Sequence, residues 1–378
     1  MRKWIAALLA VSICVIPARA VVAGAPEVNA GAVCLMEKET GNILYEQNSH
    51  DRLEPASVTK IMTLLLVMEA IDSGTLSPED MVQTSARAAS MGGSQVYLKE
   101  GETMTVRDML KSVAVVSGND AAVALAERLA GSESAFVERM NARAKELGMA
   151  DTTFMNCTGL PAMGHLTSAH DIALMSRELI GKHPAIREYT TIWMDSIRNG
   201  AFQLSNTNKL VRFYDGCTGL KTGSTDGALY CLSATAEREG MELIAVVLKG
   251  PTSADRFETA KSLLDFGFAN YALVDAKPGE ALAPVKVLLG EREFVQPVLA
   301  DTGRILVERA QMNQVETTVA LAPDVEAPVE QGQKLGEMRV TVAGEVRQTI
   351  PIVAAEGVER LTVFGILKDL LGRLLMAK

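Results

Sequence analysis

Three short segments carry residues that could together perform nucleophilic chemistry: Ser57-Val58-Thr59-Lys60, Ser117-Gly118-Asn119 and Lys221-Thr222-Gly223. Residues three apart on a helix lie on one face, so Ser57 and Lys60 are within reach of each other if a helix begins near Ser57. A serine hydroxyl is a weak nucleophile until a base removes its proton. The residue types therefore predict an active site in which Ser57 attacks and Lys60 is the base.

Lys60 can act as that base only if its amine is neutral at the working pH. Burial and a second cation both lower a lysine pKa, and Lys221 would supply that cation. The positive end of a helix beginning at Ser57 would also favour developing negative charge. An oxyanion hole needs two backbone donors, for which the N–H groups of Ser57 and Ser224 are the candidates. The simpler interpretation is a helix-capping serine, a surface lysine and a turn at Gly118-Asn119, but three such segments in this order favour an active site.

The remaining motif residues suit proton transfer and binding. Ser117 could relay a proton to a leaving amine, and Asn119 could hold a substrate amide or the side chain of the lysine base. The segment Lys221-Thr222-Gly223 predicts an edge strand. Its lysine would attract a carboxylate, its threonine hydroxyl would bind that carboxylate, and its glycine would let a substrate backbone approach closely.

Hydrophobic periodicity predicts the elements that position these residues. Two β-type runs at 32–36 and 43–46 surround Gly41-Asn42 and predict a hairpin. Residues 57–71 are apolar on every side, which predicts a buried helix that begins at Ser57. Further helices are expected at 106–129, 134–147, 167–180 and 254–267, and strands at 229–236 and 243–249. Residues 27–272 therefore predict an α/β domain with strands at both sequence ends and helices between them.

The composition changes after Tyr271. Short alternating runs separated by Gly and Pro, with a turn at Ala343-Gly344, predict a small β-rich domain over residues 278–355. On a helical wheel residues 358–378 have a continuous apolar half, but charges interrupt the segment too often for a membrane span. We expect an amphipathic helix in the membrane interface, with packing on the second domain as the alternative.

The amino terminus predicts export. Two basic residues precede the apolar run 4–16, and small residues then permit cleavage after Ala20 or Ala23, which is typical of a signal peptide over residues 1–23. An uncleaved anchor is the alternative, although the run is shorter than the ~20 residues of a span. The protein is therefore expected at the outer face of the cytoplasmic membrane. The net charge of −9, without a basic run, argues against a nucleic acid partner.

Four cysteines would remain after cleavage: Cys34, Cys157, Cys217 and Cys231. A domain of this size does not need disulfides, so we expect free thiols. A bridge between the two cysteines that flank a predicted hairpin, Cys217 and Cys231, is the alternative.

The wider sequence around the motifs resembles one family. The segments Pro55–Thr63, Ser117–Ala121 and Gly219–Gly223, with Arg256 ahead of Leu263–Phe268, are similar to low-molecular-mass penicillin-binding proteins of the D-alanyl-D-alanine carboxypeptidase family. The three short motifs also occur in class A β-lactamases, with Asp where this chain has glycine between Ser and Asn. The likeness runs from about residue 30 to the end of the chain. It implies an α/β (α+β) penicillin-binding/β-lactamase-like transpeptidase domain with a helix-flanked antiparallel sheet, followed by the β-rich domain and the terminal helix.

The resemblance also implies an activity without a metal or cofactor. Ser57 would attack the penultimate D-alanine carbonyl of peptidoglycan stem peptides, terminal D-alanine would leave, and water would hydrolyse the acyl-enzyme. β-Lactams would be covalent inhibitors. The implied catalytic residues are Ser57, Lys60, Ser117 and Asn119, and the implied substrate-binding residues are Lys221, Thr222, Gly223, Ser224 and Arg256. For Arg256 an exposed helix position is an equal alternative.

Three other functions compete with this interpretation. A class A β-lactamase uses a glutamate for deacylation, and the chain has none between Glu146 and Glu178. A peptidoglycan DD-endopeptidase and an inactive cell-wall scaffold would share the fold.

The four histidines lack metal-ligand spacing and are expected at surface or capping positions. Gly92-Gly93-Ser94 is expected as a turn, with a place at the rim of the site as the alternative, and no role is assigned to Cys157-Thr158.

Overall fold

The computed structural model describes residues 24–363 and Gly365. Its first part is built on a five-stranded antiparallel sheet of order β2-β1-β9-β8-β7. The strands are β1 (Ala32–Glu37), β2 (Ile43–Gln47), β7 (Cys217–Thr225), β8 (Leu229–Arg238) and β9 (Met241–Gly250). β1 and β2 form the predicted hairpin, and β1 also pairs with β9. The two sequence ends of this part therefore meet in one sheet, as predicted.

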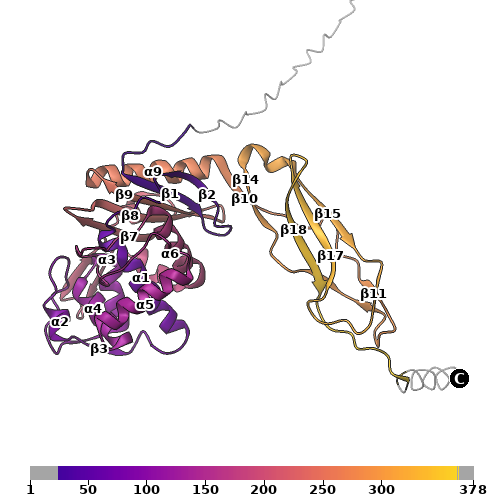
Figure 1. Ribbon diagram of the computed structural model, residues 1–378, viewed down its shortest axis with the longest axis horizontal. Coiled ribbons are helices and arrows are strands. Elements are labelled where there is room, and N and C mark those ends of the chain that lie inside the picture. Colours follow the sequence, from indigo (N-terminus) through magenta and orange to yellow (C-terminus); the bar gives the residue numbers. More distant parts are fainter. Residues whose placement is uncertain (1–23, 364, 366–378) are drawn as a thin grey trace, which may run out of the picture.

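Helices cover both faces of the sheet (Figure 1). Helix α9 packs on one face of the sheet, and the other long helices pack on the opposite face. Side chains of β9 point alternately to the two faces, so both faces are apolar. Those that face α9 are Leu243, Ala245 and Val247, and those that face the other helices are Ile244, Val246 and Leu248. The long helices are α1 (Lys60–Asp72), α3 (Val106–Val116), α4 (Asn119–Ala130), α5 (Glu133–Glu146), α6 (Ala169–Lys182) and α9 (Ser253–Asn270). The short ones are α2 (Ala86–Ala89), α7 (Arg187–Thr190), α8 (Leu210–Phe213) and the 3₁₀ helices η1 (Ala56–Thr59) and η2 (Pro184–Ile186).

Two small hairpins complete this part, β3 (Met81–Gln83) with β4 (Thr103–Thr105) and β5 (Met194–Ile197) with β6 (Phe202–Ser205). The helices predicted at 134–147, 167–180 and 254–267 are confirmed within a few residues. The single helix predicted at 106–129 is wrong. The chain breaks there into α3 and α4, because Ser117 adopts a left-handed conformation (φ 64°) that no α-helix continues through.

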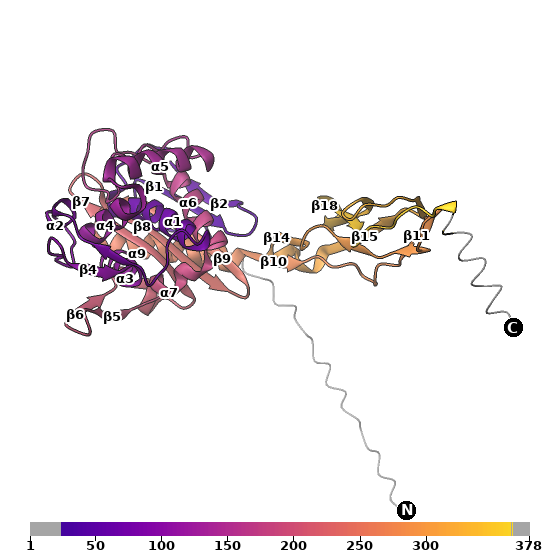
Figure 2. The same cartoon turned by 90° about the horizontal axis from the view of Figure 1, so that it is seen from below.

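The second part is β-rich, as predicted, and extends away from the first part (Figures 1 and 2). Its elements are β10 (Tyr271–Asp275), β11 (Val285–Leu288), β12 (Phe294–Val295), β13 (Pro297–Leu299), β14 (Arg304–Glu308), η3 (Arg309–Gln314), β15 (Val315–Leu321), β16 (Asp324–Glu326), β17 (Lys334–Val342) and β18 (Glu345–Ala354). β17 and β18 form the hairpin predicted at Ala343-Gly344, within the sheet β13-β18-β17-β15. The other sheets are β10-β14 and β12-β11-β16.

Two predicted terminal segments fall largely outside the described residues. The signal peptide predicted at 1–23 lies there, as does nearly all of the helix predicted at 358–378. The helix cannot begin at 358, because Val358 and Arg360 form isolated β-bridges with Val329 and Gly290. Within residues 24–363 and Gly365, no helix combines the length and the apolar character needed to cross a membrane.

Candidate active site

Ser57 lies in the 3₁₀ turn η1, which leads directly into the buried helix α1. The sequence placed Ser57 at the start of an α-helix, and the structure differs only in the tighter first turn. Ala56, immediately before it, has a φ of 48°, a conformation that costs free energy in a residue with a Cβ. Such strain persists only where surrounding contacts hold it.

Lys60 is fully buried and its Nζ has three oxygen neighbours. These are Ser57 Oγ at 2.9 Å, Asn119 Oδ1 at 2.6 Å and the Thr158 carbonyl oxygen at 2.7 Å. Burial lowers the pKa of Lys60 to about 7, against the opposing effects of Cys157 and Asp120. The amine that sequence analysis expected to be buried and within reach of Ser57 therefore meets both conditions, and burial is the main cause of its lowered pKa.

The Ser117-Gly118-Asn119 segment is the sharp connection between α3 and α4. Its left-handed serine ends α3, and Asn119 opens α4 with its side chain directed at Lys60. The buried Ser117 Oγ has no hydrogen-bond partner among the described residues. An unpaired buried hydroxyl costs stability, which is consistent with a group reserved for a substrate or a proton.

Asn119 also connects the site to the segment 92–94. Its Nδ2 donates to the Gly92 carbonyl at 2.7 Å, and its backbone N–H donates to the Ser94 carbonyl, also at 2.7 Å. The glycine-rich segment predicted as a turn therefore braces the asparagine that holds Lys60.

Strand β7 carries Lys221, Thr222, Gly223 and Ser224 along the edge of the main sheet, as predicted. Lys221 is buried, and burial lowers its pKa well below the usual value, with further lowering by Lys60 and Arg256. Its Nζ donates to the Thr222 carbonyl at 2.8 Å. The Thr222 hydroxyl shares a 2.6 Å hydrogen bond with Thr207 Oγ1.

Gly223 packs against the nucleophile turn itself. A Cβ at this position would lie 2.8 Å from Ser57 N and 2.9 Å from Val58 N, closer than side-chain carbons come to such atoms. The sequence assigned this glycine to close approach by a substrate, but the group that approaches is the Ser57 backbone. The contact brings the two predicted oxyanion donors onto adjoining segments, since Ser224 follows Gly223 and is exposed.

Arg256 lies on α9 and is buried, so the alternative of an exposed helix residue is wrong. Its Nη1 donates to the carbonyl oxygens of Gly223 at 3.1 Å and Cys231 at 3.4 Å. The guanidinium therefore holds the edge strand in place and adds positive charge beside Lys221.

The loop 153–160 belongs to the site although sequence reasoning gave it no role. It supplies the Thr158 carbonyl to Lys60, and the Cys157 carbonyl accepts from Thr63 Oγ1 at 2.7 Å. His165 braces it, because Nδ1 accepts from Met155 N–H at 2.9 Å and Nε2 therefore carries the proton toward Thr59 Oγ1 at 2.8 Å. Burial lowers the pKa of His165 to about 4, so the surface or capping position expected for the histidines is wrong here.

The four cysteines within the described residues are free, as predicted. Cys34, Cys157 and Cys231 are buried, and burial raises the pKa of each thiol. Among the residues that the structure describes, no group of three or more His, Cys, Asp or Glu side chains is arranged to hold a metal ion.

A helix-flanked antiparallel sheet with a half-buried serine and a buried lysine beside its edge strand is typical of the class of penicillin-recognising serine enzymes. Solved structures agree with this class. Penicillin-binding protein 5 from Haemophilus influenzae superposes with a TM-score of 0.78 at 29% identity, covering 89% of this chain and all of the other. Ampicillin-bound penicillin-binding protein D2 from Listeria monocytogenes matches 64% of this chain and 98% of its own, with a TM-score of 0.59 and 36% identity.

The chain belongs to the D-alanyl-D-alanine carboxypeptidase family S11, whose sequence model matches residues 19–252. The model described as the C-terminal domain of penicillin-binding protein 5 matches residues 276–360. The D-alanyl-D-alanine carboxypeptidase DacF of Bacillus subtilis is 42% identical, over 91% of this chain and 89% of its own. DacC of Escherichia coli is 34% identical, over 90% of this chain and 87% of its own. The protein is thus a serine-type D-alanyl-D-alanine carboxypeptidase, a penicillin-binding hydrolase of cell-wall metabolism.

Proposed function

We propose that the protein removes the terminal D-alanine from peptidoglycan stem pentapeptides through an acyl-enzyme on Ser57. One observation carries the assignment: the buried Lys60 Nζ lies 2.9 Å from Ser57 Oγ, with carbonyl-type oxygens at its other two contacts. A neutral amine has two N–H groups and one lone pair. Because the Asn119 and Thr158 oxygens can only accept, they take both N–H groups and leave the lone pair facing the serine hydroxyl.

In the first step Ser57 Oγ bonds to the penultimate D-alanine carbonyl carbon as Lys60 takes its proton. The N–H groups of Ser57 and Ser224 would receive the oxyanion. The C–N bond then breaks, and the proton returns to the leaving amine through the Ser117 hydroxyl, so that D-alanine departs with a neutral amine as the first product. Lys221 and Thr222 would hold the terminal carboxylate, with Gly223 and Arg256 keeping their strand in place.

Water completes the cycle by attacking the Ser57 ester. Lys60 takes a proton from the water, the ester C–O bond breaks, and Ser57 regains its hydroxyl hydrogen. A β-lactam acylates in the same way, but its leaving amine stays attached to the acyl group, so the ester persists.

The test is labelling by a fluorescent penicillin together with release of D-alanine from a stem pentapeptide. We expect the wild-type protein to be labelled and Ser57→Ala to show neither labelling nor D-alanine release at an unchanged Tm, because no other residue replaces the attacking oxygen. Unreduced labelling of Ser57→Ala would refute the assignment, and an unlabelled wild type would favour an inactive scaffold. Fast, sustained turnover of penicillin would favour a β-lactamase. Cleavage of a crosslinked stem-peptide dimer in preference to the release of D-alanine would favour a DD-endopeptidase.

We further propose that the protein is exported and that its carboxyl-terminal segment lies on the outer face of the cytoplasmic membrane. The sequence pattern of residues 361–378, which would have a continuous apolar half as a helix, supports this proposal. So does geometry: Arg360 pairs with Gly290, just after β11, at the end of the second part remote from β10 (Figure 1). Such an anchor would hold the active site away from the bilayer, toward the wall.

Removing residues 363–378 is expected to move the protein from the membrane fraction to the soluble fraction without loss of penicillin labelling. The expectation follows because the removed residues carry most of the apolar half that the sequence pattern predicts, and they come after β18, the last strand of the second part. Membrane fractionation of cells that express both forms would measure it. Retention of the truncated form on membranes would overturn the anchoring proposal.

A further inference from the structure

The two carbonyl groups that face α1 from the loop 153–160 belong to successive peptide units. The carbonyl of Cys157 accepts from Thr63 Oγ1, and the carbonyl of Thr158 accepts from Lys60 Nζ, each at 2.7 Å. In a trans peptide unit the C=O and the following N–H point in opposite directions. The N–H groups of these two units, those of Thr158 and Gly159, therefore point away from α1 and need an acceptor on the other side.

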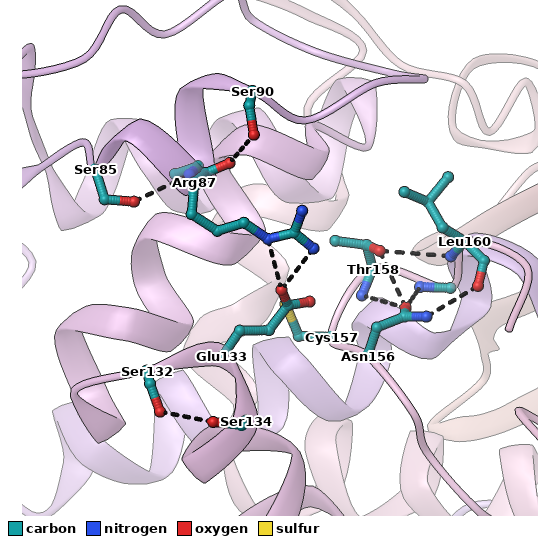
Figure 3. Close-up of polar contacts among 12 residues, drawn as sticks. Ser85, Arg87, Ser90, Ser132, Glu133, Ser134, Asn156, Cys157, Thr158 and Leu160 are labelled. Atoms are coloured by element: carbon teal, nitrogen blue, oxygen red, sulfur yellow. Dashed lines mark hydrogen bonds and ion pairs between the residues drawn. The ribbon is translucent and has the colours of Figure 1, made fainter.

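The Asn156 side chain is that acceptor. Its Oδ1 receives the Thr158 N–H at 3.1 Å, the Gly159 N–H at 2.7 Å and the Thr158 hydroxyl at 3.0 Å. Its Nδ2 donates to the Leu160 carbonyl at 2.9 Å. Figure 3 shows this side chain folded back onto its own loop. One amide therefore sets the rotation of both peptide planes.

Other contacts fix the position of the loop, but in the described structure the Gly159 N–H donates to Asn156 Oδ1 and to no other acceptor. Cys157 Sγ lies 3.6 Å from Glu133 Oε1, and Glu133 is paired with Arg87 of α2 (Figure 3). Gly159 lies against the Ala56 carbonyl, where a Cβ would come within 1.8 Å of the oxygen.

We propose that Asn156 is a positioning residue that acts through the Thr158 carbonyl to orient the lone pair of Lys60 toward Ser57. This inference rests on the proposed function of Ser57 and Lys60. Without the Asn156 oxygen, the Gly159 N–H loses its partner and the peptide plane is free to rotate. The Thr158 oxygen then no longer takes one N–H of Lys60, and the lone pair is no longer directed at the serine hydroxyl.

The rotation has a second effect, on protonation. A carbonyl oxygen beside an amine stabilises its ammonium form, so losing it moves the titration of Lys60 to lower pH. The other charged or titratable groups that face Lys60 are Asp120 from α4, the Cys157 thiol from the loop and Lys221 from β7. None of these side chains makes a hydrogen bond to Asn156 in the described structure.

The test compares the rate constant of acylation by a fluorescent penicillin, as a function of pH, in the full-length wild type and the Asn156→Ala protein. We expect the maximal rate to fall about tenfold to a hundredfold, a part of the 10²–10⁴ that a positioned base supplies. We also expect the acid limb of the profile to move to lower pH. A merely structural loss would lower the active fraction without moving that limb.

Asn141→Ala is the matched control. Asn141 also makes three side-chain hydrogen bonds to backbone groups, two of them to Phe154 of the same loop, but none to the peptide unit that faces Lys60. It is expected to lower the Tm without displacing the acid limb. Asn156→Asp keeps the accepting oxygen and adds a negative charge, so its acid limb should move to higher pH.

The proposal would be overturned by a folded Asn156→Ala protein whose acid limb lies at the same pH as that of the wild type and whose maximal acylation rate is within twofold of it. An equal displacement of the limb by Asn141→Ala would do so too. If Asn156→Ala does not fold, an Asn156→Asp protein whose acid limb does not move to higher pH would decide against the proposal. Failure of the proposed function looks different, because the wild type would then remain unlabelled or Ser57→Ala would label.

Discussion

Replacing Lys60 by methionine is expected to lower the rate of acylation by penicillin about a thousandfold, within the range that a general base contributes. The substitution nearly preserves side-chain volume in a fully buried site but removes the only amine within hydrogen-bond distance of Ser57 Oγ in the described structure. The Asn119 and Thr158 oxygens also lose their donor, so some loss of Tm is expected as well. Stopped-flow acylation and thermal unfolding would separate these two effects.

Arginine at position 60 tests whether charge alone suffices. Its guanidinium keeps the cation but does not lose its proton in proteins, so Lys60→Arg should be as slow as Lys60→Met. Acylation near the wild-type rate in the arginine protein would contradict the assignment of Lys60 as a base.

The pH profile of the wild type provides the matching measurement. Burial lowers the pKa of Lys60 to about 7, and the base is active only when neutral. The acylation rate should therefore be low at pH 5.5, rise through a midpoint near pH 7 and level off above it. A flat profile across this range would rule out a proton acceptor that titrates there.

Replacing Gly159 by alanine is expected to destabilise the protein by about 3–5 kcal/mol and to abolish penicillin labelling. Gly159 has a φ of 83°, and an added Cβ would lie 1.8 Å from the Ala56 carbonyl oxygen and 2.9 Å from Ser57 N. The added Cβ fits only if the turn that carries Ser57 moves, or if the loop that supplies the Thr158 carbonyl to Lys60 moves. Chemical denaturation would measure the loss of stability.

Gly164→Ala is the control for this change. Gly164 has a nearly identical φ of 84°, but no heavy atom lies within 4 Å of its added Cβ. Only the left-handed strain of about 1–2 kcal/mol should remain, with labelling intact. Equal losses in the two proteins would mean that backbone strain, and not contact with Ala56, makes Gly159 essential.

Much of the architecture could be predicted because it depends on local pattern. Period-two and period-3.6 apolar spacing located β1, β2, β8, β9, α5, α6 and α9 within a few residues. The break between α3 and α4 was missed because apolar spacing continues through it. The signal was present in Ser117-Gly118-Asn119, since small and polar residues tolerate a left-handed turn that ends a helix.

For the site, the sequence by itself determined the chemistry: a serine and a lysine one turn apart, a second serine with an asparagine, and a cationic edge strand. These features follow from residue type and short spacing, because the geometry of a helix or strand brings residues at such spacings close together. The sequence did not determine the surroundings of Lys60. One of its three contacts is a backbone carbonyl 98 residues away, and every residue type carries such a group.

Only the tertiary structure decided how those residues are held. It packs Gly223 and Gly159 against the turn that carries Ser57, turns Arg256 inward to the edge strand, and uses Asn156 to aim a peptide group at Lys60. The physical reason is that a buried amine must have its hydrogens accepted by fixed oxygens, and fixing a backbone oxygen requires contacts between segments far apart in the chain. Such contacts leave no periodic pattern in the sequence and appear only when the chain is folded.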